Sequence, residues 1–292
     1  MKKNLTILFL LFMLLLTSCG KPEAPAATPA PAPEAPPAPP PKTASLLVAG
    51  DNLIHSTVYR TALQYGNGER YNFVPMYKYV REYIENADIA YINQETPLGG
   101  VELELSNYPM FNSPREVADA LVEVGFDVVS HANNHILDRG ERGIQNTIDT
   151  WRAHPGITLI GVYENQEDRD AIRVTETNGI KFAWLAYTYS TNGISLPQGS
   201  PYIVPDLDAE VMADEIWRAK RMSDFVIVII HWGNENSFTP SAQQREYAQL
   251  VSDAGADVIL GSHPHVIQPI EYVGDTLVIY SLGNLFRRRM KP

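Results

Sequence analysis

The sequence predicts an α/β fold, and three observations support this prediction. Short apolar runs alternate with stretches whose apolar residues recur three and four positions apart, which is typical of strands alternating with helices. Two later segments, residues 172–188 and 267–282, have the pattern of β-hairpins, and Asn178-Gly179 in the first is typical of a primed turn. The chain is 45% hydrophobic and 20% charged, as expected of a globular protein with a sizeable core. Mixed sheets with helices outside them are therefore expected.

Residues 1–44 are predicted to precede the folded domain. A basic start and an apolar run over residues 5–16, too short to span a bilayer comfortably, indicate a signal peptide. The Leu-Thr-Ser-Cys sequence ending at Cys19 resembles a bacterial lipoprotein cleavage box, so residues 1–19 are predicted to be a lipoprotein signal peptide. Acyl chains on Cys19 would anchor the protein to the bacterial membrane on its extracytoplasmic side. An ordinary signal peptide with an incidental cysteine is the alternative.

Residues 20–44 are rich in Pro and Ala and are predicted to be an extended tether, which leaves residues 45–292 as one folded domain. Cys19 is the only cysteine, so neither a disulfide nor a thiolate metal site is expected. The chain has a formal net charge of −11, and residues 1–45 contain more Lys than Glu, so the domain is more acidic still. This acidity argues against a nucleic-acid surface, whereas bound metal ions would still permit an anionic substrate.

The first half of the domain is predicted to alternate strands with helices. Residues 45–50 form an apolar strand that ends at Asp51, and residues 74–86 carry the apolar spacing of a helix. After a strand over residues 89–92, residues 96–112 are predicted to be a long surface loop.

Ser113, Pro114 and Glu116 are then expected to begin a helix as its N-cap, first-turn proline and capping-box residue, and this helix runs to Gly125. A short apolar strand over residues 128–130 follows it.

The second half continues the alternation around the first hairpin. A helix from Gly140 to about residue 154 precedes a short strand over 158–161. After the hairpin come a Gly- and Pro-containing loop, two more helix–strand units and the second hairpin. These two units are predicted as helix 206–222 with strand 225–230 and helix 240–254 with strand 258–260. Gly255 is expected to close the last helix in the left-handed conformation.

Polar side chains follow five of these predicted strands. Six of the seven histidines, all but His154, come after such an apolar run. Because ligands bind beyond the carboxyl ends of strands in open α/β sheets, one shared site at these ends is expected. Asp, Glu, Asn and His without Cys form an oxygen and nitrogen ligand set suited to Mn, Fe, Zn or Mg. A carboxylate that bridges two such metals would give the arrangement used in phosphoryl displacement.

The sequence resembles the bacterial capsule-synthesis, poly-γ-glutamate (CapA-type) family, which is related to the calcineurin-like metallophosphoesterases. The resemblance covers residues 47–286 nearly throughout. The motifs that carry it are Gly50-Asp51, Asn93-x-Glu95-Thr96-Pro97, Ala132-Asn133-Asn134-His135 with Asp138 and Gly140, His231-Trp232-Gly233-x-Glu235, Gly261-x-His263-Pro264-His265 and Ser281-Leu282-Gly283-Asn284. It implies a four-layer α-β-β-α sandwich of two mixed sheets flanked by helices, with the site at the sheet edges.

The resemblance also implies roles for individual residues. Two divalent metal ions are expected, bridged by Glu95, with Asp51 and His265 holding one ion and three residues holding the other. These three are Asn134, His231 and His263. His135 is expected to be the general acid for the leaving group, oriented by Asp138.

Four further residues are expected to support the ligands or contact the substrate instead of binding a metal directly. They are His55, Asn93, Glu235 and Asn284. By contrast, His131 is expected to be a satisfied buried histidine, Asn133 to cap a turn and Trp232 to pack in the core.

Two functions of different classes follow from this interpretation. The first is a metal-dependent hydrolase, anchored at the cell surface, acting on a phosphoester or on an amide in a cell-envelope polymer. The second is a non-catalytic accessory subunit that binds the anionic polymer poly-γ-glutamate or its synthase. Neither the substrate nor the identity of the metals follows from the sequence.

Overall fold

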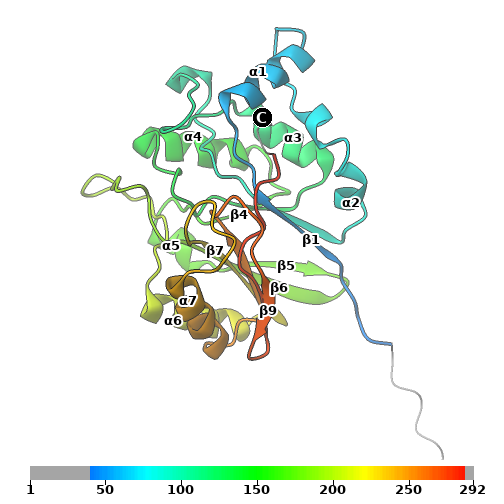
Figure 1. The fold of residues 1–292 in the computed structure, drawn as a ribbon, viewed down its shortest axis with the longest axis vertical. Helices are drawn as coiled ribbons and strands as arrows, with labels where there is room; N and C mark the ends of the chain where they lie inside the picture. Colours follow the sequence, from blue (N-terminus) through cyan, green and yellow to red (C-terminus); the bar gives the residue numbers. More distant parts are fainter. Residues whose placement is uncertain (1–39, 287–292) are drawn as a thin grey trace, which may run out of the picture. The chain divides into compact units, whose positions relative to one another are not determined.

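The computed structural model describes residues 40–286 (Figure 1). The fold below is that of the unit Pro41–Pro292, over its described residues. The predicted signal peptide, the predicted lipidation site Cys19 and most of the predicted tether lie outside the described residues. The last tether residues contact the domain, since Lys42 Nζ donates a hydrogen bond to the Gly179 carbonyl oxygen at 2.7 Å.

The first sheet has four strands, all parallel, in the order β1-β2-β3-β4. The resemblance predicted two mixed sheets, and this one differs because each of its strands is followed by a crossover instead of a hairpin turn. Its strands are β1 (Leu46–Asp51), β2 (Ile89–Asn93), β3 (Val128–Ser130) and β4 (Thr158–Ile160).

The second sheet has six strands in the order β5-β6-β7-β8-β10-β9 and is mixed. Three neighbouring pairs within it are parallel, and the pairs β5–β6 and β10–β9 are the antiparallel hairpins that the sequence predicted. Asn178 and Gly179 have φ angles of 54° and 71°, which are the positive values of the expected primed turn. Its strands are β5 (Arg173–Thr177), β6 (Ile180–Thr188), β7 (Phe225–His231), β8 (Val258–Ser262), β9 (Ile270–Val273) and β10 (Thr276–Ile279).

Three apolar layers hold these sheets and the helices together. Alternate residues of β2 face opposite sides, because side chains of a strand alternate between faces. Ile89 and Tyr91 pack between the two sheets, whereas Ala90 and Ile92 pack against helices. A third apolar cluster joins the other face of the second sheet to helices. The order helix, sheet, sheet, helix confirms the predicted four-layer α-β-β-α class.

The helices cover the outer faces of the sheets. The first sheet is covered by α1 (Ser56–Tyr65), α2 (Arg81–Glu85), α3 (Glu116–Val124) and α4 (Gly140–Arg152), and the second by α6 (Ala209–Lys220) and α7 (Ala242–Asp253). In Figure 1 these two groups lie on opposite sides of the strands. No helix among residues 40–286 is both long and apolar enough to cross a membrane.

Some local predictions were wrong. The single helix predicted over residues 74–86 is divided in the structure. A 3-10 helix, Val74–Tyr77, with Pro75 in its first turn, is followed by turns and then by the short α2. The first turn is closed by the i to i+3 hydrogen bonds of a 3-10 helix instead of the i to i+4 bonds of an α-helix. Helix α1 and the five-residue α5 (Gln166–Asp170) were not predicted. In α1 only Ala62 is fully buried, and Val58 and Tyr59 on the same face are partly buried against the core.

The segment predicted as a surface loop, residues 96–112, is partly buried. Leu98 and Phe111 belong to the core, and the segment includes a short 3-10 helix, Val101–Leu103. Ser113 does not cap α3, because its hydroxyl donates instead to Thr96 Oγ1 at 2.7 Å. The loop is therefore fastened to the domain from both ends.

Candidate metal centre

The carboxyl ends of the strands in both sheets meet at one edge of the sandwich. Asp51, Asn93 and Ser130 end three neighbouring strands of the first sheet, and His231 and Ser262 end two of the second. The segment that follows β10 bonds to the first sheet here, since Asp51 N–H donates to the Gly283 carbonyl at 2.8 Å.

Gly50 permits the close approach of the segment after β10 to strand β1. A Cβ at Gly50 would lie 1.9 Å from the Gly283 oxygen, so any other residue would push this segment away from β1. The predicted gathering of polar side chains at strand ends therefore depends on this backbone contact.

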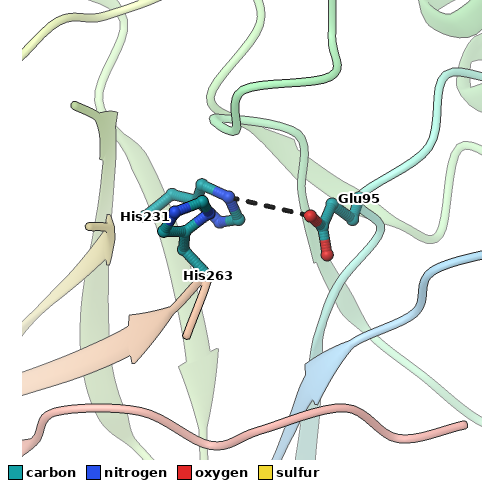
Figure 2. A group of neighbouring side chains, drawn as sticks. All are labelled: Glu95, His231 and His263. Atoms are coloured by element: carbon teal, nitrogen blue, oxygen red, sulfur yellow. Dashed lines mark ion pairs between the residues drawn. The ribbon is translucent and has the colours of Figure 1, made fainter. Parts of the chain in front are cut away.

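Glu95 lies at the centre of the gathered residues. It follows β2 and is 0% exposed, and neither carboxylate oxygen has a hydrogen-bond partner among the described residues. Figure 2 shows the carboxylate facing His231 and His263. Its Oε1 lies 3.8 Å from His231 Nε2 and also 3.8 Å from His265 Nε2. Glu95 therefore stands between two sets of potential ligands.

The first set consists of Asp51, Glu95 and His265, whose potential ligand atoms all lie within 4.8 Å of one another. His265 Nδ1 is 3.1 Å from Asp51 Oδ2 and 2.8 Å from Asn284 Oδ1. Asn93 Nδ2 donates to Asp51 Oδ1 at 2.8 Å. These three ligands were assigned to one ion, and the structure brings them together with Asn93 and Asn284 as hydrogen-bond partners.

The second set consists of Glu95, His231 and His263, again with potential ligand atoms within 4.8 Å of one another. Asn134 adjoins it, because its Oδ1 lies 2.9 Å from His231 Nε2. The same three partners of Glu95 were assigned to the second ion. The other five predicted ligands therefore gather around Glu95 and its partners, and the binding of metal by all six stays a prediction.

The backbone of the loop that follows β8 is strained at two of these ligands. His263 and His265 have φ angles of 96° and 58°, in a region that residues other than glycine rarely adopt. The N–H of His263 donates to Asp51 Oδ2 at 3.3 Å, which helps to hold this conformation. Such outliers concentrate at functional sites, because only a required side-chain position offsets their cost of about 1–3 kcal/mol.

The electrostatics of the site are those of charged groups packed together away from water. Burial raises the pKa of Glu95 well above its usual value, and Asp51 raises it further. Burial also lowers the pKa of His263 to about 4 and holds the pKa of His231 well below its usual value, with neighbouring histidines adding to both effects. For His265, burial opposes the charge, but Glu95 and Asp51 outweigh it and raise the pKa to about 10.

His135 and Asp138 form a pair beside the ligands. His135 Nδ1 lies 2.7 Å from Asp138 Oδ2, and the same oxygen accepts a hydrogen bond from Phe111 N–H at 2.6 Å. The Phe111 ring meets the His135 ring edge-on, with centroids 4.7 Å apart. His135 lines a cavity of about 210 Å³ together with His55 and Glu235. The predicted orientation of His135 by Asp138 therefore has the required contact.

Three other residues singled out in the sequence lie outside the two ligand sets. His55 Nδ1 contacts Asn107 Oδ1 at 3.0 Å and lies outside both ligand sets. Glu235 is exposed, yet one of its oxygens lies within 4.8 Å of nitrogens of His263 and His265. Asn133 serves the turn, since its Oδ1 accepts from His135 N–H at 3.0 Å.

Sequence reasoning missed several residues of the site. Ser262 and Tyr189 contact His231 and His263, at 2.8 and 3.1 Å respectively, and Asn192 Oδ1 accepts from the Asn134 side chain at 3.2 Å. Tyr189 and Asn192 lie in the irregular connection after β6, where periodicity carries no information. No pattern in the sequence pointed to them.

The donor set fits divalent cations. Glu95 Oε1 and Oε2, Asn93 Oδ1 and His263 Nδ1 are all buried without a hydrogen-bond partner in the part of the chain that the structure describes. Such groups are costly to bury, and cations between them would remove the cost. The mixture of carboxylate, amide and imidazole with no thiolate excludes a preference for soft metals.

The fold and this site define a four-layer α/β protein with a carboxylate and histidine cluster at the carboxyl ends of its strands. The chain belongs to the family described as bacterial capsule synthesis protein PGA_cap, which matches residues 45–288. This confirms the family that the sequence motifs indicated.

Known proteins similar to the chain include two from Bacillus. The PGA biosynthesis protein CapA of Bacillus subtilis (strain 168) is 36% identical over 172 residues, covering 58% of this chain and 45% of the relative. The capsule biosynthesis protein CapA of Bacillus anthracis is 31% identical over 225 residues, covering 74% and 54%. The chain thus spans about half the length of these relatives. A solved 5'-nucleotidase precursor from Thermus thermophilus is 14% identical with a TM-score of 0.48, covering 82% of this chain and 49% of that one.

Proposed function

We propose that this protein is a hydrolase that uses two divalent metal ions and acts in capsule or poly-γ-glutamate synthesis. The observation that carries the proposal is Glu95, a fully buried carboxylate with a ligand set on either side. Neither of its oxygens has a hydrogen-bond partner within residues 40–286. A buried carboxylate without a partner destabilises the folded protein by roughly several kcal/mol, unless a cation or a proton neutralises its charge.

The ligand residues would hold the cations in two places that share Glu95. Asp51 and His265 would complete one place, and His231, His263 and Asn134 the other. When bound, two divalent cations would activate a water molecule and stabilise the negative charge that develops on a phosphoryl or carbonyl oxygen. The substrate class is therefore a phosphoester, or an amide in a cell-envelope polymer.

His135 would donate the proton that the leaving group needs. With Nδ1–H donating to Asp138, the proton for transfer would be held at Nε2. Phe111 packs against the ring and its N–H fixes Asp138, so the imidazole keeps one orientation. An alkoxide leaves slowly without a proton, and a positioned acid relieves this.

Metal analysis of the purified protein, followed by an esterase panel with and without chelator, tests the proposal. The expected result is up to two equivalents of divalent metal and turnover of at least one phosphoester or γ-glutamyl amide that chelator abolishes. Absence of bound metal after loading with Mn²⁺ or Zn²⁺ would overturn it.

A second candidate function is a non-catalytic accessory role, favoured by the family description, which names capsule synthesis and not hydrolysis. In that role the surface around the six predicted metal ligands would bind poly-γ-glutamate or its synthase. Metal binding without turnover on any ester or amide would favour this candidate. Asp51→Ala should then weaken binding of poly-γ-glutamate, while a distant exposed control, Glu176→Gln, should not.

The site is proposed to work outside the cytoplasm, on a protein anchored through Cys19. The support is the cleavage-box sequence ending at Cys19 and the Pro- and Ala-rich stretch after it. Cys19→Ala should abolish incorporation of labelled lipid and leave unprocessed precursor or released protein. Normal lipid labelling of that variant would contradict the anchor.

A further inference from the structure

The imidazoles of His231 and His265 both turn Nδ1 toward an oxygen outside the ligand sets. His231 Nδ1 lies 2.8 Å from Ser262 Oγ, and His265 Nδ1 lies 2.8 Å from Asn284 Oδ1. In both rings the other nitrogen, Nε2, faces predicted ligands: it lies 3.8 Å from Glu95 Oε1, and in His231 it also lies 2.9 Å from Asn134 Oδ1. Because a neutral imidazole has one N–H and one lone pair, a bond from Nδ1–H to oxygen would put the lone pair on Nε2, on the side of these ligands.

His263 has the opposite arrangement. Its Nε2 lies 3.1 Å from the Tyr189 hydroxyl, and its Nδ1 is buried without any hydrogen-bond partner among the described residues. His263 itself is 3% exposed, so this nitrogen is shielded from bulk solvent. The unpartnered atom of His263 is thus Nδ1, whereas His231 and His265 present Nε2 to the carboxylate.

We propose that Tyr189 is a positioning residue that makes His263 a metal ligand through Nδ1, while His231 and His265 bind through Nε2. Nε2–H of His263 donates to the Tyr189 oxygen, which fixes the tautomer and leaves the Nδ1 lone pair for the cation. This inference rests on the metal centre proposed above, but not on any catalytic activity.

Tyr189 is well placed for this task. Its backbone N–H donates to the carbonyl of His231 at 2.9 Å, so the residue is anchored to the last residue of β7. Its ring lies against the His263 ring with centroids 4.8 Å apart and is stacked on His231 at 6.5 Å.

Tyr189→Phe tests the role of the hydroxyl, because it keeps the ring and removes only the acceptor. In a Zn²⁺ titration of the full chain, the affinity of one of the two sites should fall by roughly 10–100-fold and the other should be unchanged. The matched control is Tyr187→Phe, which removes a hydroxyl bonded to Glu215 at 2.6 Å from the strand that leads to Tyr189. The control should lower the melting temperature of the metal-free protein and leave both affinities unchanged.

The tautomers can be read directly by NMR of the zinc-loaded protein with isotope-labelled histidine. One ring, assigned with His263→Gln, should carry its proton on Nε2, and two should carry it on Nδ1. Three rings of one tautomer, or equal zinc affinities for Tyr189→Phe and the wild type, would overturn the inference. A wild-type protein that binds no metal would instead overturn the proposed function, so the two failures are distinguishable.

Discussion

Two buried histidine environments in this protein look alike in sequence and differ in chemistry. His131 and His231 each follow an apolar strand, and both are 0% exposed. His131 Nε2 accepts a hydrogen bond from Trp151 Nε1 at 2.8 Å, and burial alone lowers its pKa to about 3. His231 lies among Glu95, His263 and Asn134.

The difference shows what makes a buried histidine a candidate ligand. His131 Nδ1 also lacks a hydrogen-bond partner among the described residues, so an unpartnered nitrogen is not enough. The six-residue ligand cluster differs because carboxylates and several imidazoles converge on the same space. Convergence of donors, not burial, separates the two environments, and each prediction below tests that separation.

The largest effect is expected for Glu95→Gln. If Glu95 serves both ions, the variant should lose both, because a neutral amide cannot bridge two cations as a carboxylate does. Metal content after loading and desalting is the measurement. The control Glu176→Gln changes an exposed carboxylate on β5 and should keep the wild-type stoichiometry. Full stoichiometry in Glu95→Gln would show that the carboxylate is not a bridge.

The next effect is expected for His135→Asn. As a general acid, His135 should contribute roughly 10²–10⁴-fold to the rate with alkyl phosphoesters and much less with nitrophenyl esters, whose leaving group departs without a proton. Metal content should not change, and His154→Asn, which removes a histidine paired with Asp119, should have wild-type rates. Loss of metal from the His135 variant would make His135 a ligand.

The smallest effect concerns the His131 environment and pH. The folded-state pKa of about 3 lies below the ordinary value of 6.5, so the unfolded chain binds more protons between these values. The stability from neutral His131 is therefore complete above pH 6.5 and declines as the pH falls toward 3, by up to ~1.4 kcal/mol per pH unit.

Urea unfolding of the wild type and His131→Gln at several pH values measures this contribution. The difference in free energy of unfolding should shrink as the pH falls, and metal affinity at neutral pH should be equal in the two proteins. Weaker metal binding by His131→Gln would break the distinction between the two environments.

The sequence by itself determined the order of the strands and of helices α3, α4, α6 and α7, the hairpin at Asn178-Gly179 and the polar residues that follow the strands. These follow from local physics, since side chains alternate along strands and positive φ angles select Asn and Gly. The cluster was predictable because parallel strands deliver their carboxyl ends to one edge, so Asp51, Glu95 and His231 were recognisable from their positions after apolar runs.

Only the tertiary structure decided which atoms face one another. Three residues contact the histidine nitrogens that face away from Glu95, and they come from separate segments of the chain: Ser262, Asn284 and Tyr189. Tyr189 lies in an irregular connection without periodicity. The different roles of His131 and His231 were expected from the family resemblance, and the tertiary structure supplied the contacts that separate them, Trp151 for His131 and Glu95 for His231. Local patterns specify where a side chain leaves the backbone, whereas its partners depend on how the two sheets pack.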